Sequence, residues 1–264
     1  MKSIFIIGCP RSGTTLLQSL VAACDDVITF KESHFYDKGF GIGITGWIKT
    51  KQFNEVIRQF LYKNGLSAEY LNSFTGKRNC YQSSRQFLEI LDRAALAARK
   101  TAWVEKTPDH LFHIPIIKKT RPEAKFLHIV RLPEQTVKSL FTASRLWGKP
   151  RSKAAFKIKW LITSIITLAY LPKKNHKVVF YEDIVEETEK VMTEVCKWLE
   201  INPRKDYIES YQSEAVSIIN HDEIWKSKNL MPISGTENIA YNSSGITLLN
   251  RLYNIIRRIN RYYH

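Results

Sequence analysis

The sequence has few cysteines, and their spacing matches neither a metal site nor a disulfide framework. The 264 residues contain four, at positions 9, 24, 80 and 196, with no C-x-x-C pair among them. Scattered cysteines are typical of proteins in a reducing compartment, so we expect a cytoplasmic protein. Cys9 would be a reactive thiol if its surroundings lowered its pKa, but a small buried loop residue is the simpler interpretation.

Long hydrophobic runs are also missing. The longest, residues 160–171, is closed by Pro172, whereas a membrane-spanning helix needs about 20 apolar residues. We expect this run to form a buried helix. Residues 1–3 lead directly into a predicted strand without the pattern of a cleavable signal. No tract has a linker composition, so the sequence predicts a single domain over residues 1–264.

Acidic residues are scarce relative to basic ones. The chain has 25 Asp plus Glu against 40 Lys plus Arg, a formal net charge of +15. Such a surface attracts polyanions, which include nucleic acid, a membrane face, a nucleotide and an acidic glycan. Net charge alone does not choose among them, and a basic solvated surface without a dedicated partner is also consistent with it.

One lysine is missing from a phosphate-binding pattern near the N-terminus. Residues 4–17 (IFIIGCPRSGTTLL) have the pattern of a strand, a tight loop and a helix. Residues 8–13 match G-x-x-x-x-G, a loop in which backbone N–H groups and a helix N-terminus face an anion. Nucleoside triphosphatases continue with Lys and then Ser or Thr, but this chain has Thr14 and Thr15, and its cation comes earlier, at Arg11. We therefore predict a phosphate-like ligand other than magnesium-triphosphate.

Strand and helix patterns alternate along the rest of the chain. Strands are predicted at residues 4–7, 27–30, 102–104, 125–130 and 178–181. Helical spacing occurs from residue 14, at 52–63, 83–100 and 109–119, from 133, and at 184–199 and 247–262. This alternation predicts an α/β fold of three layers, with a central parallel sheet and helices on both faces, of the P-loop type. The order of the strands does not follow from the sequence.

Polar side chains follow three of the predicted strands. They are Lys31, Glu32, Ser33 and His34 after the second strand, Glu105, Lys106 and Thr107 (followed by Pro108) after the third, and Arg131 after the fourth. Ligands of open α/β sheets bind at the carboxyl ends of the strands. We therefore expect these side chains to face the loop at residues 8–13, which we call the anion loop. Cations and a carboxylate around an anion site indicate transfer of a charged group.

Four segments together resemble a known family. They are PRSGTT at 10–15, EKTP at 105–108, RLPEQTVKS at 131–139 and FYED at 180–183. In this order they are similar to the sulfotransferases that use 3′-phosphoadenosine 5′-phosphosulfate (PAPS), and the loop and the glutamate at position 32 are more like the tyrosylprotein and carbohydrate branch. The resemblance runs from residue 3 to about residue 200. It implies a PAPS donor and no metal.

The resemblance implies roles for residues on the donor side. Arg11 would neutralise charge on the bridging oxygen, while Ser12, Gly13, Thr14 and Thr15 would bind oxygens of the 5′-phosphosulfate. Because PAPS has no γ-phosphate, the missing loop lysine is explained.

Residues farther along the chain would hold the rest of the nucleotide. Arg131 and Ser139 would bind the 3′-phosphate. Leu132 stands where the family usually has Asp, so a helix cap is lost. Tyr181 would lie near the nucleotide, although a core tyrosine is an equal alternative.

The resemblance also implies the catalytic groups. Lys106 would contact the sulfuryl oxygens as charge develops. Glu32 resembles the glutamate base of the tyrosylprotein branch, and His34 is the rival because the small-molecule cytosolic branch uses a histidine. A third alternative for Glu32 is a structural carboxylate that pairs with Lys31, Arg11 or Lys106.

The acceptor is not defined by the motifs. Residues 35–100 and 205–245, where the motifs fade, are predicted insertions on the acceptor side. The acceptor would be a hydroxyl group, and the basic surface favours an anionic glycan or a lipid-linked sugar over nucleic acid. The aromatic residues Phe35, Tyr36, Trp47 and Trp147 could stack on a sugar or phenol, or belong to the core.

Several further features are ambiguous. Residues 39–46 contain G-x-G-x-x-G without a strand before it, which favours a flexible flap. Asp109 is a predicted cap for the helix to residue 119, and His110 and His113 on that helix lack the further ligands of a metal set, so surface or packing roles are expected. Residues 225–228 and 234–236 are the two candidates for the basic loop that relatives place over the 3′-phosphate, and the sequence does not choose between them.

The final helix and the overall function each leave alternatives. The helix at 247–262 is either docked on its own domain or lies on a membrane surface. One alternative function is a small-molecule kinase of the P-loop type, which a lysine at position 14 would have supported. The other is a non-catalytic protein that binds polyanions or a membrane surface.

Overall fold

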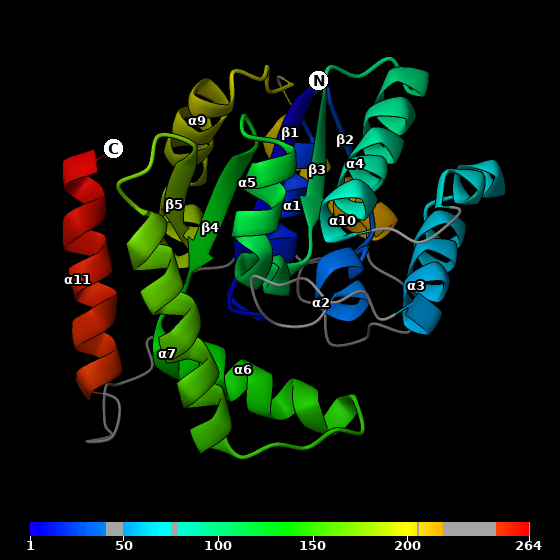
Figure 1. Cartoon of the computed structure of the whole chain (residues 1–264). Coiled ribbons are helices and arrows are strands. Elements are labelled where there is room, and N and C mark those ends of the chain that lie inside the picture. The colour runs from blue at the N-terminus through cyan, green and yellow to red at the C-terminus, as the bar shows by residue number, and fades with distance from the viewer. Residues whose placement is uncertain (41–49, 75–78, 205, 219–246, 264) are drawn as a thin grey trace.

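The computed structural model describes residues 1–40, 50–74, 79–204, 206–218 and 247–263 (Figure 1). Five parallel strands form one sheet in the order β2-β3-β1-β4-β5. The strands are β1 (Lys2–Gly8), β2 (Val27–Thr29), β3 (Ala102–Lys106), β4 (Lys125–Val130) and β5 (His176–Phe180). The predicted α/β fold with a central parallel sheet is confirmed. The strand order reverses direction at β1, which creates a ligand crevice beside its carboxyl end.

Helices cover both faces of this sheet. One face carries α2 (Phe35–Gly39), α3 (Thr50–Lys63), α4 (Cys80–Ala97) and α5 (Ile114–Thr120), and the opposite face carries α1 (Thr14–Ala22), α8 (Tyr181–Glu186), α9 (Thr188–Leu199) and α10 (Tyr207–Ile218). A third cluster lies at the β4–β5 end, where α6 (Pro133–Leu146), α7 (Lys153–Tyr170) and α11 (Thr247–Tyr263) pack. The short helices η1 (Ala68–Phe74) and η2 (Pro108–His113) complete the described elements.

The central strand supplies both halves of the core. Successive side chains of a strand point to opposite faces, so Phe5 packs on the α4–α5 side, with its ring 5.3 Å from Trp103 and 5.5 Å from Phe126. Ile4 and Ile6 belong to the cluster under α1 and α9. Both faces are covered, which is why β1 has an almost continuous apolar sequence.

The region after β3 differs from the prediction. The expected helix at 109–119 is divided into η2 and α5, and Pro115 stands in the first turn of α5, where a missing N–H costs nothing. Asp109 does not cap either helix. Its carboxylate pairs instead with Lys159 of α7, at 2.8 Å, because η2 lies against α7.

The long apolar run is helical but only half buried, which corrects the expectation of a buried helix. Phe156 and Trp160 of α7 are buried, whereas Ile158, Ile162 and Ile165 are 57%, 44% and 51% exposed. In the part of the chain that the structure describes, no helix combines the length and hydropathy needed to cross a membrane.

The final helix docks on its own domain. Tyr253 donates a hydrogen bond of 2.7 Å to Glu182, and Arg257 lies 2.5 Å from Asp183. The other Glu182 oxygen accepts the Leu132 N–H at 2.9 Å. Leu132 itself provides no side-chain cap, as expected. The acidic pair of FYED therefore ties α11 to the start of α6.

Candidate active site

The anion loop connects β1 to α1 and is shaped by close approaches at its two glycines. Gly8 has a φ of +150°, and a Cβ there would lie 2.5 Å from the carbonyl oxygen of Ile129. Gly13 has a φ of +96°, and a Cβ there would lie 2.3 Å from the ring of Tyr181. A side chain at either position would collide with β4 or α8, so only glycine allows the loop to sit in this crevice.

The cations predicted to bind the donor gather beside this loop. Arg11 Nε donates a hydrogen bond to Ser139 Oγ of α6 at 3.2 Å. Arg131 Nη1 donates to the carbonyl of Arg11 at 3.5 Å, and its guanidinium lies 4.1 Å from the centre of the Tyr181 ring. The structure thus joins Arg11 to Ser139, although the resemblance assigned these residues to different phosphates.

The start of α1 presents buried polar groups that suit a phosphate. Ser12 is fully buried, and its hydroxyl has no hydrogen-bond partner among the described residues. Thr14 and Thr15 are 4% and 6% exposed. A buried hydroxyl without a partner is costly, so the loop residues fit an anionic ligand that would supply acceptor oxygens here.

The strand-end residues on the other side of the crevice form a connected pair. Lys106 is completely buried and makes an ion pair with Glu32. Its ammonium also contacts the hydroxyl of Thr15 at 3.4 Å, which links the anion loop to the carboxylate. Glu32 Oε2 lies 3.4 Å from His34 Nε2. Lys106 therefore has as its neighbours the two residues predicted as alternative bases, Glu32 directly and His34 through Glu32.

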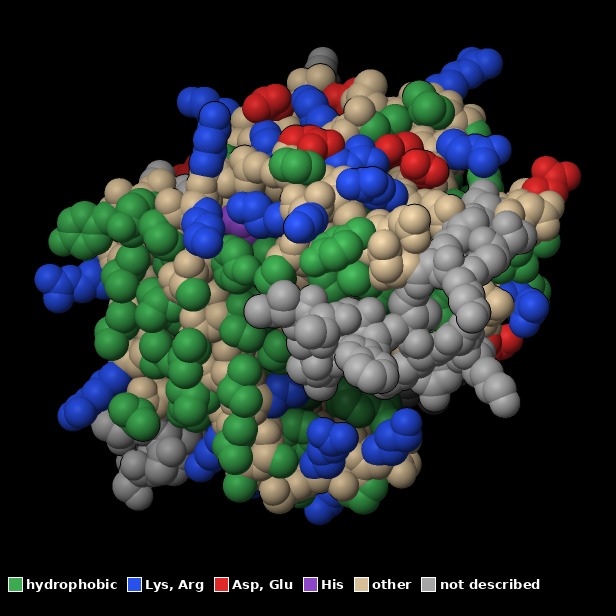
Figure 2. All heavy atoms as spheres, viewed as in Figure 1, with side chains coloured by type: hydrophobic (Ala, Val, Ile, Leu, Met, Phe, Trp, Pro, Cys, Tyr) green, Lys and Arg blue, Asp and Glu red, His purple; other side chains and the backbone are tan. Residues whose placement is uncertain are grey.

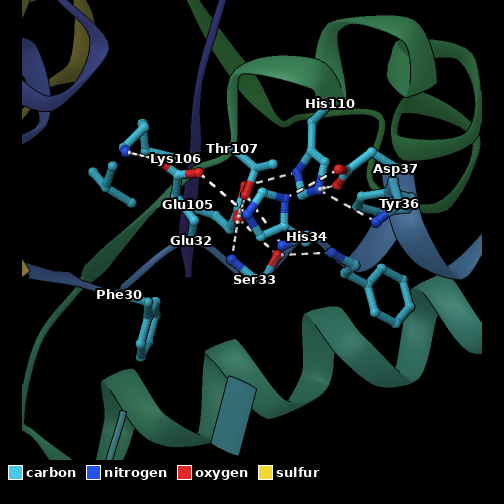
Figure 3. A network of polar contacts seen from close by, with 12 residues as sticks. Phe30, Glu32, Ser33, His34, Tyr36, Asp37, Glu105, Lys106, Thr107 and His110 are labelled. Atoms are coloured by element: carbon cyan, nitrogen blue, oxygen red, sulfur yellow. Dashed lines mark hydrogen bonds and ion pairs between the residues drawn. The ribbon is translucent and has the colours of Figure 1, made fainter. Parts of the chain in front are cut away.

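A network behind His34 extends this cluster into the interior (Figure 3). His34 Nδ1 lies 3.0 Å from Asp37 Oδ2, and Asp37 Oδ1 lies 3.6 Å from His110 Nε2. His110 Nδ1 lies 2.8 Å from Glu105 Oε2. A chain of alternating carboxylates and imidazoles thus runs from the buried end of β3, through η2 and α2, to Glu32.

The buried end of this network is held by hydroxyl groups. Glu105 is fully buried, and its Oε1 accepts hydrogen bonds of 2.7 Å from both Ser33 and Thr107. Burial opposes ionisation of Glu105, but the neighbouring His110 and these donors outweigh it, so the pKa of Glu105 is lower than usual. Glu105 is therefore a fixed negative charge inside the protein.

Protonation of the two central residues follows from their pairing. Burial disfavours a charged His110, but Glu105 and Asp37 on either side raise its pKa to about 9. Burial likewise disfavours a charged Asp37, but His110 and His34 outweigh it and hold its pKa below the usual range. The amide of Tyr36 also points at His110 Nε2, at 3.3 Å, a contact that would suit a neutral ring. The two carboxylates outweigh this contact.

Two of the predicted site residues have unusual backbone conformations. Arg11 has a φ of 70° and His34 a φ of 51°. A left-handed conformation is uncommon for residues other than glycine and is concentrated at functional sites. Both residues stand where the chain leaves a strand and turns into a helix.

Two members of the network, Asp37 and His110, were not predicted as functional. Asp37 follows His34 by three residues, the spacing of one helical turn, and this was the available signal. His110 and His113 are buried rather than on the surface; His113 packs with its ring 6.0 Å from that of Tyr36, as a packing role predicts. Glu105 was predicted to lie at the strand end beside the loop, but its contacts with Ser33 and His110 were not, because these partners come from other segments of the chain.

The predicted aromatic residues that the structure describes belong to the core, and Trp147 is half-buried against the cluster of α6, α7 and α11. Phe35 and Tyr36 are fully buried in the core, so neither stacks on an acceptor. Cys9 is buried, and burial raises its pKa to about 12, which makes it a packing residue. Trp47, residues 41–46 of the predicted flap, and the loops 225–228 and 234–236 lie outside the described residues.

The model of the sulfotransferase family matches residues 3–206 of this chain. The chain belongs to the sulfotransferase family. The match includes every segment on which the resemblance was based, and membership identifies the protein as an enzyme. A protein-tyrosine sulfotransferase of Drosophila melanogaster is 26% identical over 258 residues, which are 90% of this chain and 43% of that relative. The chain therefore spans less than half the length of that protein.

Solved structures share the fold of this sulfotransferase. The sulfotransferase domain of the Synechococcus PCC 7002 olefin synthase matches with a TM-score of 0.64 and 17% identity, over 97% of this chain and 94% of the other. The domain from the curacin biosynthetic pathway has a TM-score of 0.62 and 17% identity, with 97% of each chain covered. A mouse sulfotransferase solved with PAP has a TM-score of 0.56 and 15% identity, covering 99% of this chain and 88% of that one.

Proposed function

We propose that this sulfotransferase transfers a sulfuryl group from PAPS to a hydroxyl acceptor without a metal, and releases adenosine 3′,5′-bisphosphate (PAP). One observation carries the proposal: buried Lys106 contacts Thr15 of the anion loop on one side and Glu32 on the other. An anion site, a cation and a carboxylate therefore share one edge of the sheet. The mouse sulfotransferase solved with PAP supports this donor.

The donor side would hold two anionic groups. Ser12, Gly13, Thr14 and Thr15 would bind the 5′-phosphosulfate, where the N–H groups at the start of α1 favour negative charge. Arg131 and Ser139 would bind the 3′-phosphate. Arg11, which already donates to Ser139, would lie between the two groups and stabilise charge on the bridging oxygen as it leaves.

Tyr181 would act through Arg131. Its ring is in contact range of Gly13 on one side and lies 4.1 Å from the Arg131 guanidinium on the other. Stacking on an aromatic ring fixes the plane of a guanidinium and leaves its N–H groups free to point at a phosphate. Tyr181 is thus a positioning residue in this proposal.

The acceptor side would supply the base. In an in-line transfer the acceptor oxygen forms a bond to sulfur as the bond from sulfur to the nucleotide oxygen breaks, and the hydroxyl proton passes to Glu32. The Lys106 ammonium pairs with Glu32 and would stabilise the charge that develops on the sulfuryl oxygens. As Glu32 takes the proton, its attraction to Lys106 weakens and the interaction of Lys106 with those oxygens strengthens.

His34 would orient Glu32 rather than take the proton itself. Its Nδ1 contacts Asp37, and its Nε2 faces Glu32, so Glu32 is held between the imidazole on one side and Lys106 on the other. We therefore propose Glu32 as the base and His34 as its positioning residue.

The acceptor class and the compartment are part of the proposal. The net charge of +15 favours an anionic glycan or a lipid-linked sugar. A cytoplasmic location is supported by the four free cysteines. A screen of radiolabelled sulfate transfer across glycans, phenols, lipids and peptides would identify the acceptor.

Binding measurements test the donor assignment directly. By calorimetry, PAP should bind the wild-type protein more tightly than adenosine 5′-monophosphate does. Arg131→Ala should weaken PAP binding by roughly 10- to 100-fold, the value of a charged hydrogen bond, and leave monophosphate binding nearly unchanged. Arg85→Ala, at an exposed position on α4, is the matched control.

Two outcomes would favour the alternative functions. Tight binding of magnesium-ATP with no binding of PAP would indicate a kinase of the P-loop type. Binding of heparin or liposomes with no nucleotide binding and no sulfate transfer would indicate a non-catalytic protein.

A further inference from the structure

Helix α7 has an apolar face on the outside of the molecule. Its exposed positions after Lys153 are Ala154, Ile158, Ile162, Ile165 and Ala169, spaced by three or four residues. They form one stripe along the whole helix. Single exposed apolar side chains are common on soluble proteins, but a continuous stripe marks an interaction surface.

Helix α11 lies against α7 and extends this surface. Leu248, Ile255 and Tyr262 follow one another at intervals of seven residues and are 69%, 47% and 75% exposed. Figure 2 shows hydrophobic side chains gathered over α7 and α11, with Lys and Arg at the margins, while the acidic side chains in this view lie mainly toward the top and right. We call this surface the α7–α11 face.

The cations around the α7–α11 face have no acidic counterparts in the same segments. Arg251 and Arg258 are exposed between the apolar residues of α11. Arg151 and Lys153 are exposed at the start of α7, and residues 173–174 are two lysines just after its end. Between Glu134 and Glu182 the sequence has no Asp or Glu, and α11 has none.

We propose that the α7–α11 face docks this enzyme on an anionic lipid surface, with the apolar stripe inserted among the acyl chains and the surrounding Lys and Arg at the headgroups. A helix with apolar residues on one side and basic residues beside them is the usual element for binding in the plane of a membrane. Exposed Tyr262 and Tyr263 at the end of α11 suit the interface between water and lipid.

The charges favour a lipid surface over a second copy of the chain. A symmetric dimer through this face would place the same basic margin of one copy against that of the other. Like charges facing each other disfavour association. An anionic bilayer supplies the opposite charge together with an apolar interior.

Docking would fix how the active site faces the membrane. Helix α7 carries the α7–α11 face on its exposed side and packs against the candidate site on its buried side. On its buried side, Trp160 donates a hydrogen bond of 3.0 Å to the carbonyl of Arg131, and Lys159 pairs with Asp109 of η2. The helix is therefore firmly attached to the edge that carries the candidate nucleotide residues. This inference does not depend on the identity of the acceptor.

Vesicle sedimentation with the full chain tests the proposal. We expect binding to vesicles of phosphatidylcholine with phosphatidylserine and weaker binding to phosphatidylcholine alone. A triple variant, Ile158→Ser with Ile162→Ser and Ile165→Ser, should lower the partition coefficient by roughly 10- to 100-fold. Because these side chains are exposed, the fold should be retained, which circular dichroism checks.

Two further variants separate the contribution of charge to vesicle binding from that of the apolar stripe. Arg251→Gln and Arg258→Gln should each lower binding to anionic vesicles by roughly 5-fold and binding to phosphatidylcholine very little. Leu96→Ser, which removes an apolar side chain of α4 that is 65% exposed, is the matched control and should leave binding unchanged.

Three results would overturn the proposal. The first is no binding to anionic vesicles at physiological salt. The second is binding that the triple serine variant does not reduce, because charge alone would then be sufficient. The third is a dimer, measured by analytical ultracentrifugation, that the same variant dissociates, because the face would then be an interface between copies of this chain.

Discussion

The two sides of the candidate site are constructed in different ways. The donor side depends on backbone conformation, with close approaches at Gly8 and Gly13 and the start of α1 facing the crevice. The acceptor side depends on titratable side chains, which are Glu32, His34, Asp37, Glu105, Lys106 and His110. The donor side is thus a backbone geometry that one short segment can adopt, whereas the acceptor side is a set of contacts among three segments.

This difference predicts different sensitivities. A buried network of charges is costly when one member is lost, because the remaining charges are left without partners. A loop held by close packing is sensitive to added volume instead. Substitutions on the acceptor side should therefore affect catalysis, stability and the pH dependence of stability, and substitutions that add volume on the donor side should affect stability and nucleotide binding.

The largest expected effect is on turnover. Glu32→Gln should lower the turnover number by about 10²- to 10⁴-fold, the usual contribution of a positioned base, because the amide cannot accept the proton. PAP affinity should change by less than roughly 3-fold, since the proposed role of Glu32 is on the acceptor side. Sulfate transfer to the acceptor identified by the screen, and calorimetry with PAP, provide the two measurements.

Companion variants make this result specific. His34→Gln should lower turnover by a smaller factor, and Glu89→Gln, at an exposed position on α4, should have no effect. If His34→Gln abolished turnover while Glu32→Gln retained it, the histidine would be the base.

The next effect is a loss of stability at alkaline pH. His110 has a pKa of about 9 in the folded protein, above its ordinary value of 6.5. A raised pKa adds stability that is complete below pH 6.5 and is lost as the pH rises through 9. The free energy of unfolding should fall across this window by about 3 kcal/mol, which denaturant titrations at several pH values would measure.

Two histidine variants provide the comparison. His110→Gln should be less stable at neutral pH and should lose most of the pH dependence between 6.5 and 9. His176→Gln should retain that pH dependence, because burial lowers the pKa of His176 and keeps it neutral across the window. If His110→Gln kept the pH dependence of stability seen in the wild type, His110 would not be the residue responsible for it.

The smallest expected effect is a difference in stability between substitutions at two glycines with positive φ. Gly148→Ala should cost about 1 kcal/mol, because nothing lies within 4 Å of the new Cβ and only the left-handed backbone disfavours it. Gly13→Ala should cost roughly 1–3 kcal/mol more, because its Cβ would collide with Tyr181. Chemical unfolding measures both.

The same pair also tests the donor side. Gly13→Ala should weaken PAP binding, since Tyr181 must move and Arg131 stacks on it. Equal losses of stability in the two variants would contradict the proposed role of close packing at the loop.

Local patterns were sufficient for much of the fold. The apolar run before Gly8 is β1, and the strand patterns at 27–30, 102–104 and 125–130 coincide with β2, β3 and β4. The segment after β3 was predicted less well, because Pro115 divides one expected helix into two and Asp109 pairs with α7 instead of capping. That pairing depends on where α7 lies, which no local pattern specifies.

The sequence by itself determined the anion loop and the cations around it, together with the parallel α/β fold and the family. These features follow from residues close together in the chain, since a glycine pattern and a strand end are local properties. Tertiary structure alone decided the strand order, which places β2 beside β3 and so brings Ser33 to Glu105. It also decided that α7 exposes its isoleucines. Contacts between distant segments depend on how the elements pack, so the network behind Glu32 emerges only in the folded chain.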